Sequence, residues 1–435
     1  MNDRATPFTA EPNQGVQETD GRDGGARHLA GDALRQALID ARARTWALVH
    51  DLIPAQWIPP IQPGVNPIAW ELAHLAWFAE FWVLRGPHQF SSDGLATAQQ
   101  APRFAGPDAH LDSARLTHHL RWTTPMPDAE RLKKMLDDQL GACVATVTAG
   151  DVHESAATGA SRHDDALYFH RLALFHEDMH AEALCWLRDA LGYAPPPVTA
   201  VPVCGQRQAL SVRGGEVRLG SGANSAGFAF DNERPGKYVQ LQDFEMDSHP
   251  VSALDFAEFV NAGGYARPQY WPAEAGHWRS LANISHPSHW RPGPSGDWQM
   301  RWFDQWLALQ PGVPAMHINA FEAEAYCLWA KRRLPTAAQW EHAAQSLPVN
   351  QHGVADAVRF NWGNSVWEWT ANTFAPYPGF SAGPYRQYSE PWFGDHRELR
   401  GGSFATHPRM HHPHYRNFFL PSRSDIFAGF RTAAL

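Results

Sequence analysis

The sequence has little cysteine, and its four cysteines form no recognisable set. Cys143, Cys185, Cys204 and Cys327 show no CxxC pair or other metal-binding spacing. So few cysteines in so long a chain also exclude a disulfide-stabilised scaffold. We interpret them as mostly buried thiols.

Long apolar runs and an excess of basic residues are absent as well. No stretch approaches the ~18 apolar residues that a membrane-spanning helix requires. The formal net charge is −9, which argues against a broad basic surface for nucleic acid. The first 28 residues lack a basic start followed by an apolar segment, which favours a disordered tail over a signal peptide. We therefore expect a cytoplasmic protein that binds neither membrane nor nucleic acid.

Apolar and aromatic residues, in contrast, are abundant enough for more than one core. Hydrophobic residues make up 44% of the chain, and tryptophan occurs 19 times. Because 435 residues exceed what one core usually organises, two domains are expected. The run APPPVTAVPV is typical of a stiff, extended linker. This pattern predicts a disordered tail at 1–28, a helical domain at 29–195, a linker at 196–204 and a second domain at 205–435.

Helical periodicity dominates the first domain. Segments at 30–52, 67–86, 128–148 and 163–191 carry apolar residues three and four positions apart. Prolines or glycines stand at several of their ends, and a loop is expected at 150–160. The set predicts a four-helix bundle with a long crossover connection.

Two histidines in the fourth segment are spaced like metal ligands. His176 and His180, in LYFHRLALFHEDMHAEALCWL, lie one helical turn apart and project from nearly one face. Such a pair can bind a divalent ion if another element completes the site. His74, central to an apolar helix, is the candidate third ligand, with a hydrogen-bonded core histidine as the competing interpretation. Glu182 points roughly 200° away from His180 and is expected to support the site without binding the ion.

Beyond the linker, glycine, proline, tryptophan and asparagine become frequent. Short strands are predicted at 216–219 and 238–241. Only two good helices are predicted, near 253–261 and 320–330. The second domain is therefore expected to be α+β with much irregular structure.

The second domain resembles a known family along its whole length. The segments that carry the resemblance are GGEVRLGSGANSAGFAFDNERPGKYVQL, INAFEAEAYCLWAKRRLPTAAQWEHAA, GNSVWEWTANTF, LRGGSFAT and DIFAGFRTA. They follow, in order, the pattern of formylglycine-generating-enzyme-type (sulfatase-modifying factor) domains, which implies a C-type-lectin-like fold. No cysteine follows Cys327, so the peptide-cysteine oxidation of formylglycine-generating enzymes is not expected. Preceded by a DinB-like four-helix bundle with HxxxHxE, the chain resembles the ergothioneine synthase family and the related selenoneine synthases.

That resemblance implies an Fe(II) centre at His74, His176 and His180 and a reaction that consumes O2. In the family, a chalcogen atom is joined to the imidazole carbon between the two nitrogens of hercynine, the trimethylated betaine of histidine. Three histidines leave positions open for soft ligands, and iron offers a redox route that zinc lacks. The implied partners are hercynine, a selenosugar or thiol donor and O2, bound by a monomer or small homo-oligomer.

The resemblance also implies a catalytic tyrosine. In the family it supplies a proton or hydrogen atom and steers oxygen chemistry towards bond formation. Its setting is matched by PYRQYSEPWF, which makes Tyr385 the candidate, with Tyr388 beside it. Aromatic packing is the competing interpretation for both rings.

Hercynine carries a permanent cation, which favours aromatic faces, and a carboxylate, which favours amide or cationic donors. The string YRNFF supplies both types of group. By resemblance, Asn417 holds the carboxylate and Phe418 lies near the trimethylammonium, with Tyr415 and Arg416 beside them. Met179 stands where family members often have a glutamine that orients the imidazole. Core packing is the competing interpretation for these aromatic residues.

The donor is predicted from RNFFLPSRSDIF. In family members that use γ-glutamylcysteine the comparable segment resembles RNWDxPxRRQIF, whose aspartate and arginine hold the glutamyl group. Arg423 retains the arginine, but Phe419 replaces the aspartate and Ser424 the second arginine. This favours a neutral, hydroxylated selenosugar as donor and hence selenoneine synthesis.

Three alternatives stay open. The chain could be an ergothioneine synthase that forms a hercynyl sulfoxide conjugate from cysteine or γ-glutamylcysteine, with Asp425 supplying the missing carboxylate. A zinc-dependent thiol transferase of the DinB type would work without oxygen. A binding module would need only the lectin-like domain and would consume no O2.

Overall fold

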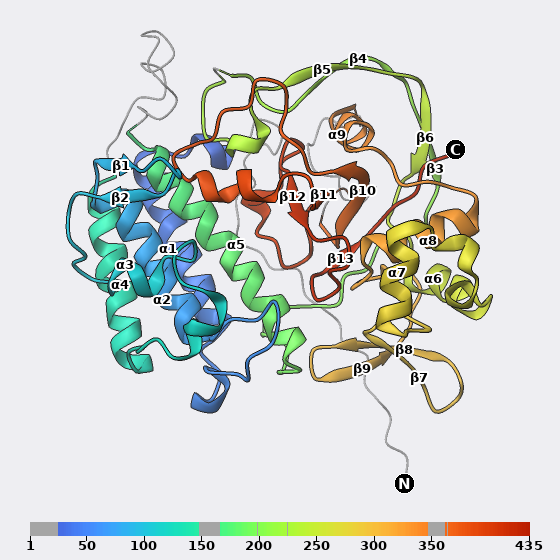
Figure 1. The fold of residues 1–435 in the computed structure, drawn as a ribbon, viewed down its shortest axis with the longest axis horizontal. Helices are drawn as coiled ribbons and strands as arrows, with labels where there is room; N and C mark the ends of the chain where they lie inside the picture. Colours follow the sequence, from blue (N-terminus) through green and yellow to red (C-terminus); the bar gives the residue numbers. More distant parts are fainter. Residues whose placement is uncertain (1–24, 148–165, 198, 224, 347–361, 363) are drawn as a thin grey trace.

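The computed structural model describes residues 25–147, 166–197, 199–223, 225–346, 362 and 364–435. A helical region and a mixed α and β region lie side by side, and the long helix α5 (Tyr168–Ala190) runs between them (Figure 1). The expected two-domain fold, an all-α bundle followed by an α+β domain, is confirmed. Most of the predicted tail, the loop at 150–160 and the predicted start of the fourth helix lie outside the described residues.

Four long helices form the bundle: α1 (Gly31–Ala47), α2 (Ile68–Ala79), α4 (Ala129–Ala145) and α5. Every residue of α2 is buried, which explains why its sequence is apolar all round. It continues into a π-helical turn, Glu80–Leu84. The Asp128 side chain begins α4 by accepting a hydrogen bond from the backbone N–H of Arg131.

The long crossover between α2 and α4 contains a hairpin of β1 (His88–Phe90) and β2 (Ala96–Ala98) and a short helix α3 (Asp108–Leu111). Glu80, which is fully buried, accepts hydrogen bonds from the backbone N–H groups of residues 103–105. This buried carboxylate fixes the crossover against the end of α2.

The second domain is built on small sheets. The largest has the order β12-β11-β10-β13, formed by β12 (Asn417–Phe419), β11 (Arg397–Gly401), β10 (Trp367–Thr373) and β13 (Ala428–Gly429). In it β10 and β13 are parallel, and the other neighbours are antiparallel. The remaining strands form two antiparallel pairs and a three-stranded sheet: β3 (Ala209–Val212) with β6 (Phe244–Asp247), β4 (Gly215–Leu219) with β5 (Lys237–Leu241), and β7 (Trp290–Pro292), β8 (Trp298–Trp302) and β9 (Gln305–Ala308).

The second domain also has more helices than its sequence predicted. The expected helices are α6 (Ala253–Asn261) and α8 (Ala320–Ala330), and α7 (Ala273–Ala282) and α9 (Ala337–Ser346) occur in addition. Ala275 is the only buried residue of α7, so this helix lacks the apolar stripe on which the prediction relied.

The two domains share a hydrophobic core and buried polar contacts. The ring of Phe175 on α5 packs against that of Phe228, with centroids 5.0 Å apart. Arg27 lies in the short 3-10 helix Gly25–His28, is 6% exposed and pairs with the buried Glu233. The structure therefore has order inside the predicted tail, because this arginine compensates a buried carboxylate of the other domain.

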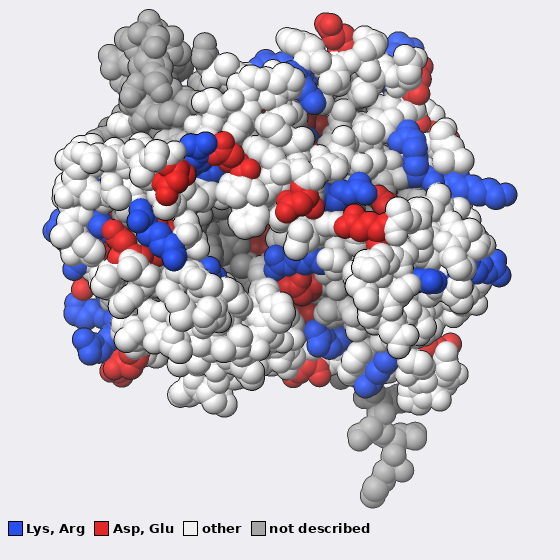
Figure 2. Space-filling model, viewed as in Figure 1, with Lys and Arg blue, Asp and Glu red and all other residues white. Residues whose placement is uncertain are grey.

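On the face that Figure 2 shows, acidic and basic side chains are interspersed, with no large area of one sign. No helix in the described part of the chain is long and apolar enough to cross a membrane.

Candidate metal centre and substrate cavity

The three histidines predicted as ligands lie together between α2 and α5. Ring centroids are separated by 5.2 Å for His74 and His176, 5.0 Å for His74 and His180, and 4.4 Å for His176 and His180. One ring nitrogen of each lies within 4.8 Å of the others. Two ligands at ~2.1 Å from one ion stand about 3.4 Å apart, so small side-chain rotations would complete a three-nitrogen site.

Hydrogen bonds set the orientation of two of these rings. His74 Nδ1 lies 2.7 Å from the backbone oxygen of Leu111, and His180 Nδ1 lies 2.5 Å from Glu71 Oε2. An Nδ1–H that donates to an oxygen leaves Nε2 with its lone pair available for a metal. The residues present therefore fit a divalent ion.

The surroundings keep the imidazoles of His74 and His176 neutral and Glu71 ionised. Burial, followed by the nearby His180, lowers the pKa of His74 to about 3, and burial lowers the pKa of His176 well below its usual range. Burial acts to raise the pKa of Glu71, but His180 outweighs it and lowers that pKa to about 2. Neutral nitrogens beside a fixed negative charge favour a bound cation.

Two other groups of histidine and acidic residues occur in the described part of the chain, and neither is arranged as well for a metal. The rings of His289 and His317 near Asp189 stack at 3.9 Å with an interplanar angle of 9°, so their in-plane lone pairs run side by side without converging. In the second group, both oxygens of Glu233 accept hydrogen bonds from Arg27, while His412 and His414 complete the group.

The two candidate tyrosines differ in position. The ring of Tyr385 lies 6.2 Å from that of His176 and 5.0 Å from Phe78, which itself stacks on His176 at 3.5 Å. Tyr388 stacks on Phe230, and its hydroxyl lies 3.5 Å from that of Tyr415. The structure therefore places Tyr385 beside the candidate metal centre. Burial raises the pKa of Tyr385 to about 12, which keeps its proton in place at neutral pH.

A cavity of about 120 Å³ lies on the next face of α5, between the two domains. Four residues predicted to bind substrate line it, namely Met179, Tyr415, Asn417 and Phe419. Because Met179 directly precedes His180, the cavity begins beside a candidate ligand. The other lining residues are Glu182, Ala183, Trp186, Trp367 and Ile426.

Arg416 and Phe418, which were also predicted to bind substrate, are not among the residues that line this cavity. Arg416 directly precedes Asn417 and Phe418 directly follows it, and successive residues of an extended chain point to opposite faces. Arg416 is 1% exposed and pairs with Glu398. The ring of Phe418 stacks on Phe374 at 4.1 Å. Arg416 is therefore part of a buried ion pair, and Phe418 is a partly buried ring that packs against Phe374.

Arg423 lies at the edge of the cavity, with its guanidinium 4.7 Å from the rings of both Trp186 and Phe419. It forms a two-point ion pair with Asp425, at 2.8 and 3.0 Å. The guanidinium of Arg423, which was predicted to bind the donor molecule, is therefore already paired with the carboxylate of Asp425.

Glu182 has the supporting position that its helical phase indicated. Its carboxylate accepts hydrogen bonds from Trp367 Nε1 at 2.7 Å, Ser403 Oγ at 2.6 Å and Thr406 Oγ1 at 2.7 Å. All three donors belong to the second domain, so this residue joins α5 to the lectin-like domain.

Sequence reasoning missed several residues around the site. Glu71, Trp186 and Trp367 were not named, nor was Arg121, whose guanidinium lies 4.2 Å from the Trp70 ring beside His74. Glu71 carried a usable signal, because a carboxylate within an all-apolar helix requires a buried partner.

Comparisons with known proteins agree with this architecture. The Sulfatase-modifying factor enzyme 1-like domain family matches residues 198–365 and 344–434, and the DinB superfamily matches residues 37–184. A protein named hercynine oxygenase from Mycolicibacterium smegmatis is 29% identical over 93% of this chain and 99% of its own length. The chain belongs to the ergothioneine synthase-like family.

Further relatives support the same assignment. A hercynine oxygenase from Mycobacterium tuberculosis is 29% identical over 91% of this ergothioneine synthase-like chain and 97% of its own length. A formylglycine-generating enzyme from Thermomonospora curvata matches only 52% of the chain, at 27% identity. The hercynine oxygenases thus match both domains of this ergothioneine synthase-like protein.

Proposed function

We propose that this enzyme forms a carbon–chalcogen bond on the imidazole carbon of hercynine, using O2 and Fe(II) held by His74, His176 and His180. The supporting observation is that the candidate metal centre and the cavity share α5, with Met179 and His180 adjacent in the chain. Two hercynine oxygenases match both domains. Bound iron would supply the oxygen chemistry and an open position for a soft selenium or sulfur ligand.

The cavity contains groups suited to both ends of hercynine. Asn417 Oδ1 accepts a hydrogen bond from the backbone N–H of Phe418 at 2.8 Å, so its amide NH2 is left to donate to a carboxylate. Aromatic rings of Trp186, Trp367, Tyr415 and Phe419 line the same space and offer faces to a trimethylammonium cation.

Tyr385 is the proposed proton donor. Its hydroxyl stays protonated because its pKa is raised, and its ring lies against the group formed by His176 and Phe78. A neutral phenol beside the metal can give up a proton only as negative charge develops there. We assign Tyr388 to packing and to its contact with the Tyr415 hydroxyl.

For the donor, the structure favours a neutral molecule. A glutamyl carboxylate would have to displace Asp425 from Arg423, and a glutamyl ammonium would meet Phe419 at the edge of the cavity. Each loses a charge-assisted contact worth about 1.5 to 3 kcal/mol. We therefore propose a selenosugar as donor and selenoneine synthesis as the function.

An ergothioneine synthase that uses a sulfur donor is the second candidate. Asp425 favours it, because this carboxylate lies beside Arg423 and could receive a donor ammonium if the ion pair opened. The zinc-dependent transferase is disfavoured by the position of Tyr385, a residue of the second domain, beside the metal centre.

The test is anaerobic reconstitution with Fe(II), followed by hercynine, a donor and air, with product identification by mass spectrometry. Equal amounts of selenosugar and γ-glutamylcysteine in one reaction compare the two donors directly. We expect O2 uptake and a hercynine–selenosugar conjugate, both absent in His74→Ala. Turnover with zinc under nitrogen would contradict the iron proposal, and a preference for γ-glutamylcysteine would contradict only the donor assignment.

A further inference from the structure

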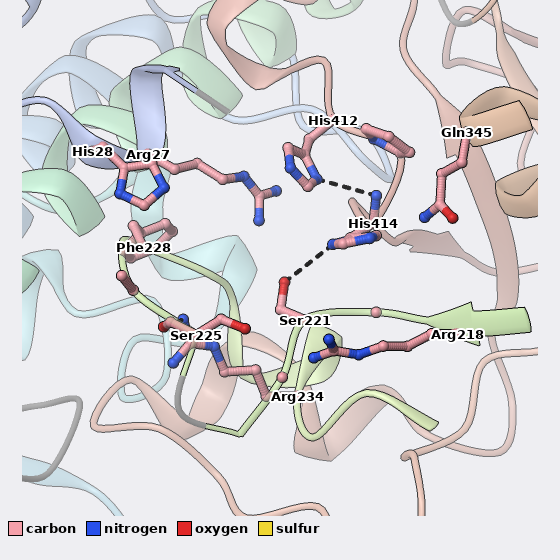
Figure 3. Close-up of a pocket in the computed structure, with 14 residues that line it drawn as sticks. Arg27, His28, Arg218, Ser221, Ser225, Phe228, Arg234, Gln345, His412 and His414 are labelled. Carbon is pink, nitrogen blue, oxygen red and sulfur yellow. Dashed lines mark hydrogen bonds between the residues drawn. The ribbon is translucent and has the colours of Figure 1, made fainter. Parts of the chain in front are cut away.

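A second cavity, with a volume of about 360 Å³, lies outside the substrate cavity (Figure 3). Its wall combines the start of the described chain (Arg27, His28) with the end of β4 and the following turn (Arg218, Ser221) and with His412 and His414. Volumes of about 300 to 1,000 Å³ are typical of small-molecule sites. This cavity is three times as large as the one beside the metal centre.

The lining of this second cavity is strongly basic. Three arginines and three histidines contribute to it, and no aspartate or glutamate is among the described residues that line it. The charge of Arg27 is balanced by Glu233, to which its guanidinium donates two hydrogen bonds of 2.5 and 3.0 Å. Arg218 is exposed on β4, and no carboxylate in the described ranges pairs with it. Its charge is therefore available to a ligand.

Donor groups converge on the space beside Arg218. Figure 3 shows Ser221, His412 and His414 around the same hollow. Ser221 Oγ lies 3.2 Å from His414 Nδ1, and His412 Nδ1 accepts the backbone N–H of His414 at 3.1 Å. Because Nδ1 accepts, Nε2 of the neutral His412 imidazole carries the ring proton and can donate it, and within the described residues it has no hydrogen-bond partner.

Burial and nearby positive charge both lower the pKa values of the two histidines in the cavity. Burial and then the charge of Arg27 lower the pKa of His412, and burial together with Arg27, Arg400 and Arg218 lowers that of His414 to about 4, despite Glu233. Both imidazoles are held neutral chiefly by burial, and the nearby arginines add repulsion against a further proton. A bound anion would relieve that repulsion.

We propose that this cavity binds the oxyanion, phosphate or carboxylate, of a small organic molecule, with Arg218, Ser221 and the imidazoles of His412 and His414 as its contacts. A metal ion is the less suitable occupant, because Glu233 is held by Arg27 and Arg218 would repel a cation. The site belongs to both domains, since Arg27 precedes the bundle.

The position of the site connects it with the substrate cavity. His414 is followed directly by Tyr415, and Asn417 lies two residues further on; both of these line the substrate cavity. An occupant that orders residues 412–414 therefore acts on the segment that holds the proposed hercynine contacts. The proposal does not depend on the identity of the chalcogen donor.

The test is isothermal titration of the iron-loaded enzyme with inorganic phosphate and, separately, with succinate. Arg218→Ala removes the free charge, Arg218→Lys retains it, and Arg213→Ala is the control, an exposed arginine before the same strand. We expect saturable binding of at least one anion, weakened about tenfold or more in Arg218→Ala, less in Arg218→Lys and not in Arg213→Ala. The anion that binds more tightly identifies the class of ligand.

A second readout locates the bound anion. The ring signals of His412 and His414 in NMR spectra of the enzyme loaded with diamagnetic zinc should titrate at higher pH when the anion is present. No saturable binding of either anion, or equal affinity in wild type and Arg218→Ala, would overturn the proposal. The proposed function would be unaffected, because it is measured by O2 uptake and product formation.

Discussion

Glu71→Gln is the sharpest test of how the metal centre is organised. Glu71 is 3% exposed, and its two oxygens serve two donors: His180 Nδ1 at 2.5 Å and Asn66 Nδ2 at 2.5 Å. Glutamine has nearly the same volume but only one acceptor oxygen. If its oxygen faces His180, its NH2 group opposes the NH2 group of Asn66. If it is reversed, its NH2 donates to His180 Nδ1 and moves the ring proton to the nitrogen that should bind the metal.

The first arrangement costs one buried hydrogen bond, about 1 to 3 kcal/mol, and the second costs His180 the tautomer that metal binding through Nε2 requires. Part of that cost falls on the ligand His180, so we expect metal affinity to fall about 10- to 100-fold, the usual range for a residue that orients a metal-binding histidine. The assay is anaerobic competition for Fe(II), or for Co(II) as a stable substitute, against a chromophoric chelator. Circular dichroism checks that the bundle remains helical.

Glu177→Gln is the matched control. Glu177 is a buried carboxylate on α5 next to His176, but it pairs with Arg42 at 2.7 Å and contacts no candidate ligand. This variant should lose stability and keep its metal affinity. The reasoning is refuted if Glu71→Gln binds metal as tightly as the wild type, or if both variants lose affinity equally.

Three further predictions concern the tyrosine, the donor and the domain interface. Tyr385→Phe should keep metal and hercynine binding but divert O2 to oxidation of the donor alone, which the ratio of O2 consumed to product formed would measure. If Tyr385→Phe forms normal product and Tyr388→Phe forms none, Tyr388 is the proton donor. Phe419→Asp places a carboxylate near Arg423 and should raise kcat/KM for γ-glutamylcysteine relative to a selenosugar by about ten- to a hundredfold; an unchanged ratio would contradict the proposed donor pocket. Burial opposes ionisation of Asp189, but His317 and His289 lower its pKa to about 2, so its stabilising effect is complete above its usual value of 3.8 and is lost as pH falls towards 2. Asp189→Asn should therefore destabilise the protein by roughly 3 kcal/mol at pH 7 and flatten the acid limb of a thermal-denaturation profile, and an unaltered profile would exclude this role.

Local sequence patterns predicted the parts of the site that one element determines. The spacing of His176 and His180 depends only on helical geometry, and His74 was identified because it is the histidine within a helix that is apolar all round. The strand β12 shows why the two-residue period of side chains along a strand has to be considered. YRNFF was interpreted as one substrate-binding block, whereas alternation separates Asn417 and Phe419 from Phe418.

Long-range contacts could not be predicted from local patterns. Glu71 and His180 are 109 residues apart, and nothing near either residue specifies the other. Trp367 was visible as part of a family motif, but its role at the cavity depends on how the second domain docks against α5. The pairing of Arg27 with Glu233 likewise orders a segment that composition alone assigned to a tail.

The docking of the two domains explains why the site needs both of them. Helix α5 presents His176 and His180 to α2, and on its adjacent face it presents Met179 and Glu182 to the second domain. Glu182 accepts three hydrogen bonds there, although burial raises its pKa. A carboxylate with three directional donors tolerates little sliding, because each displaced donor would leave a buried polar group unsatisfied. The distance between the cavity and the candidate metal centre is therefore set by one rigid helix and one buried carboxylate.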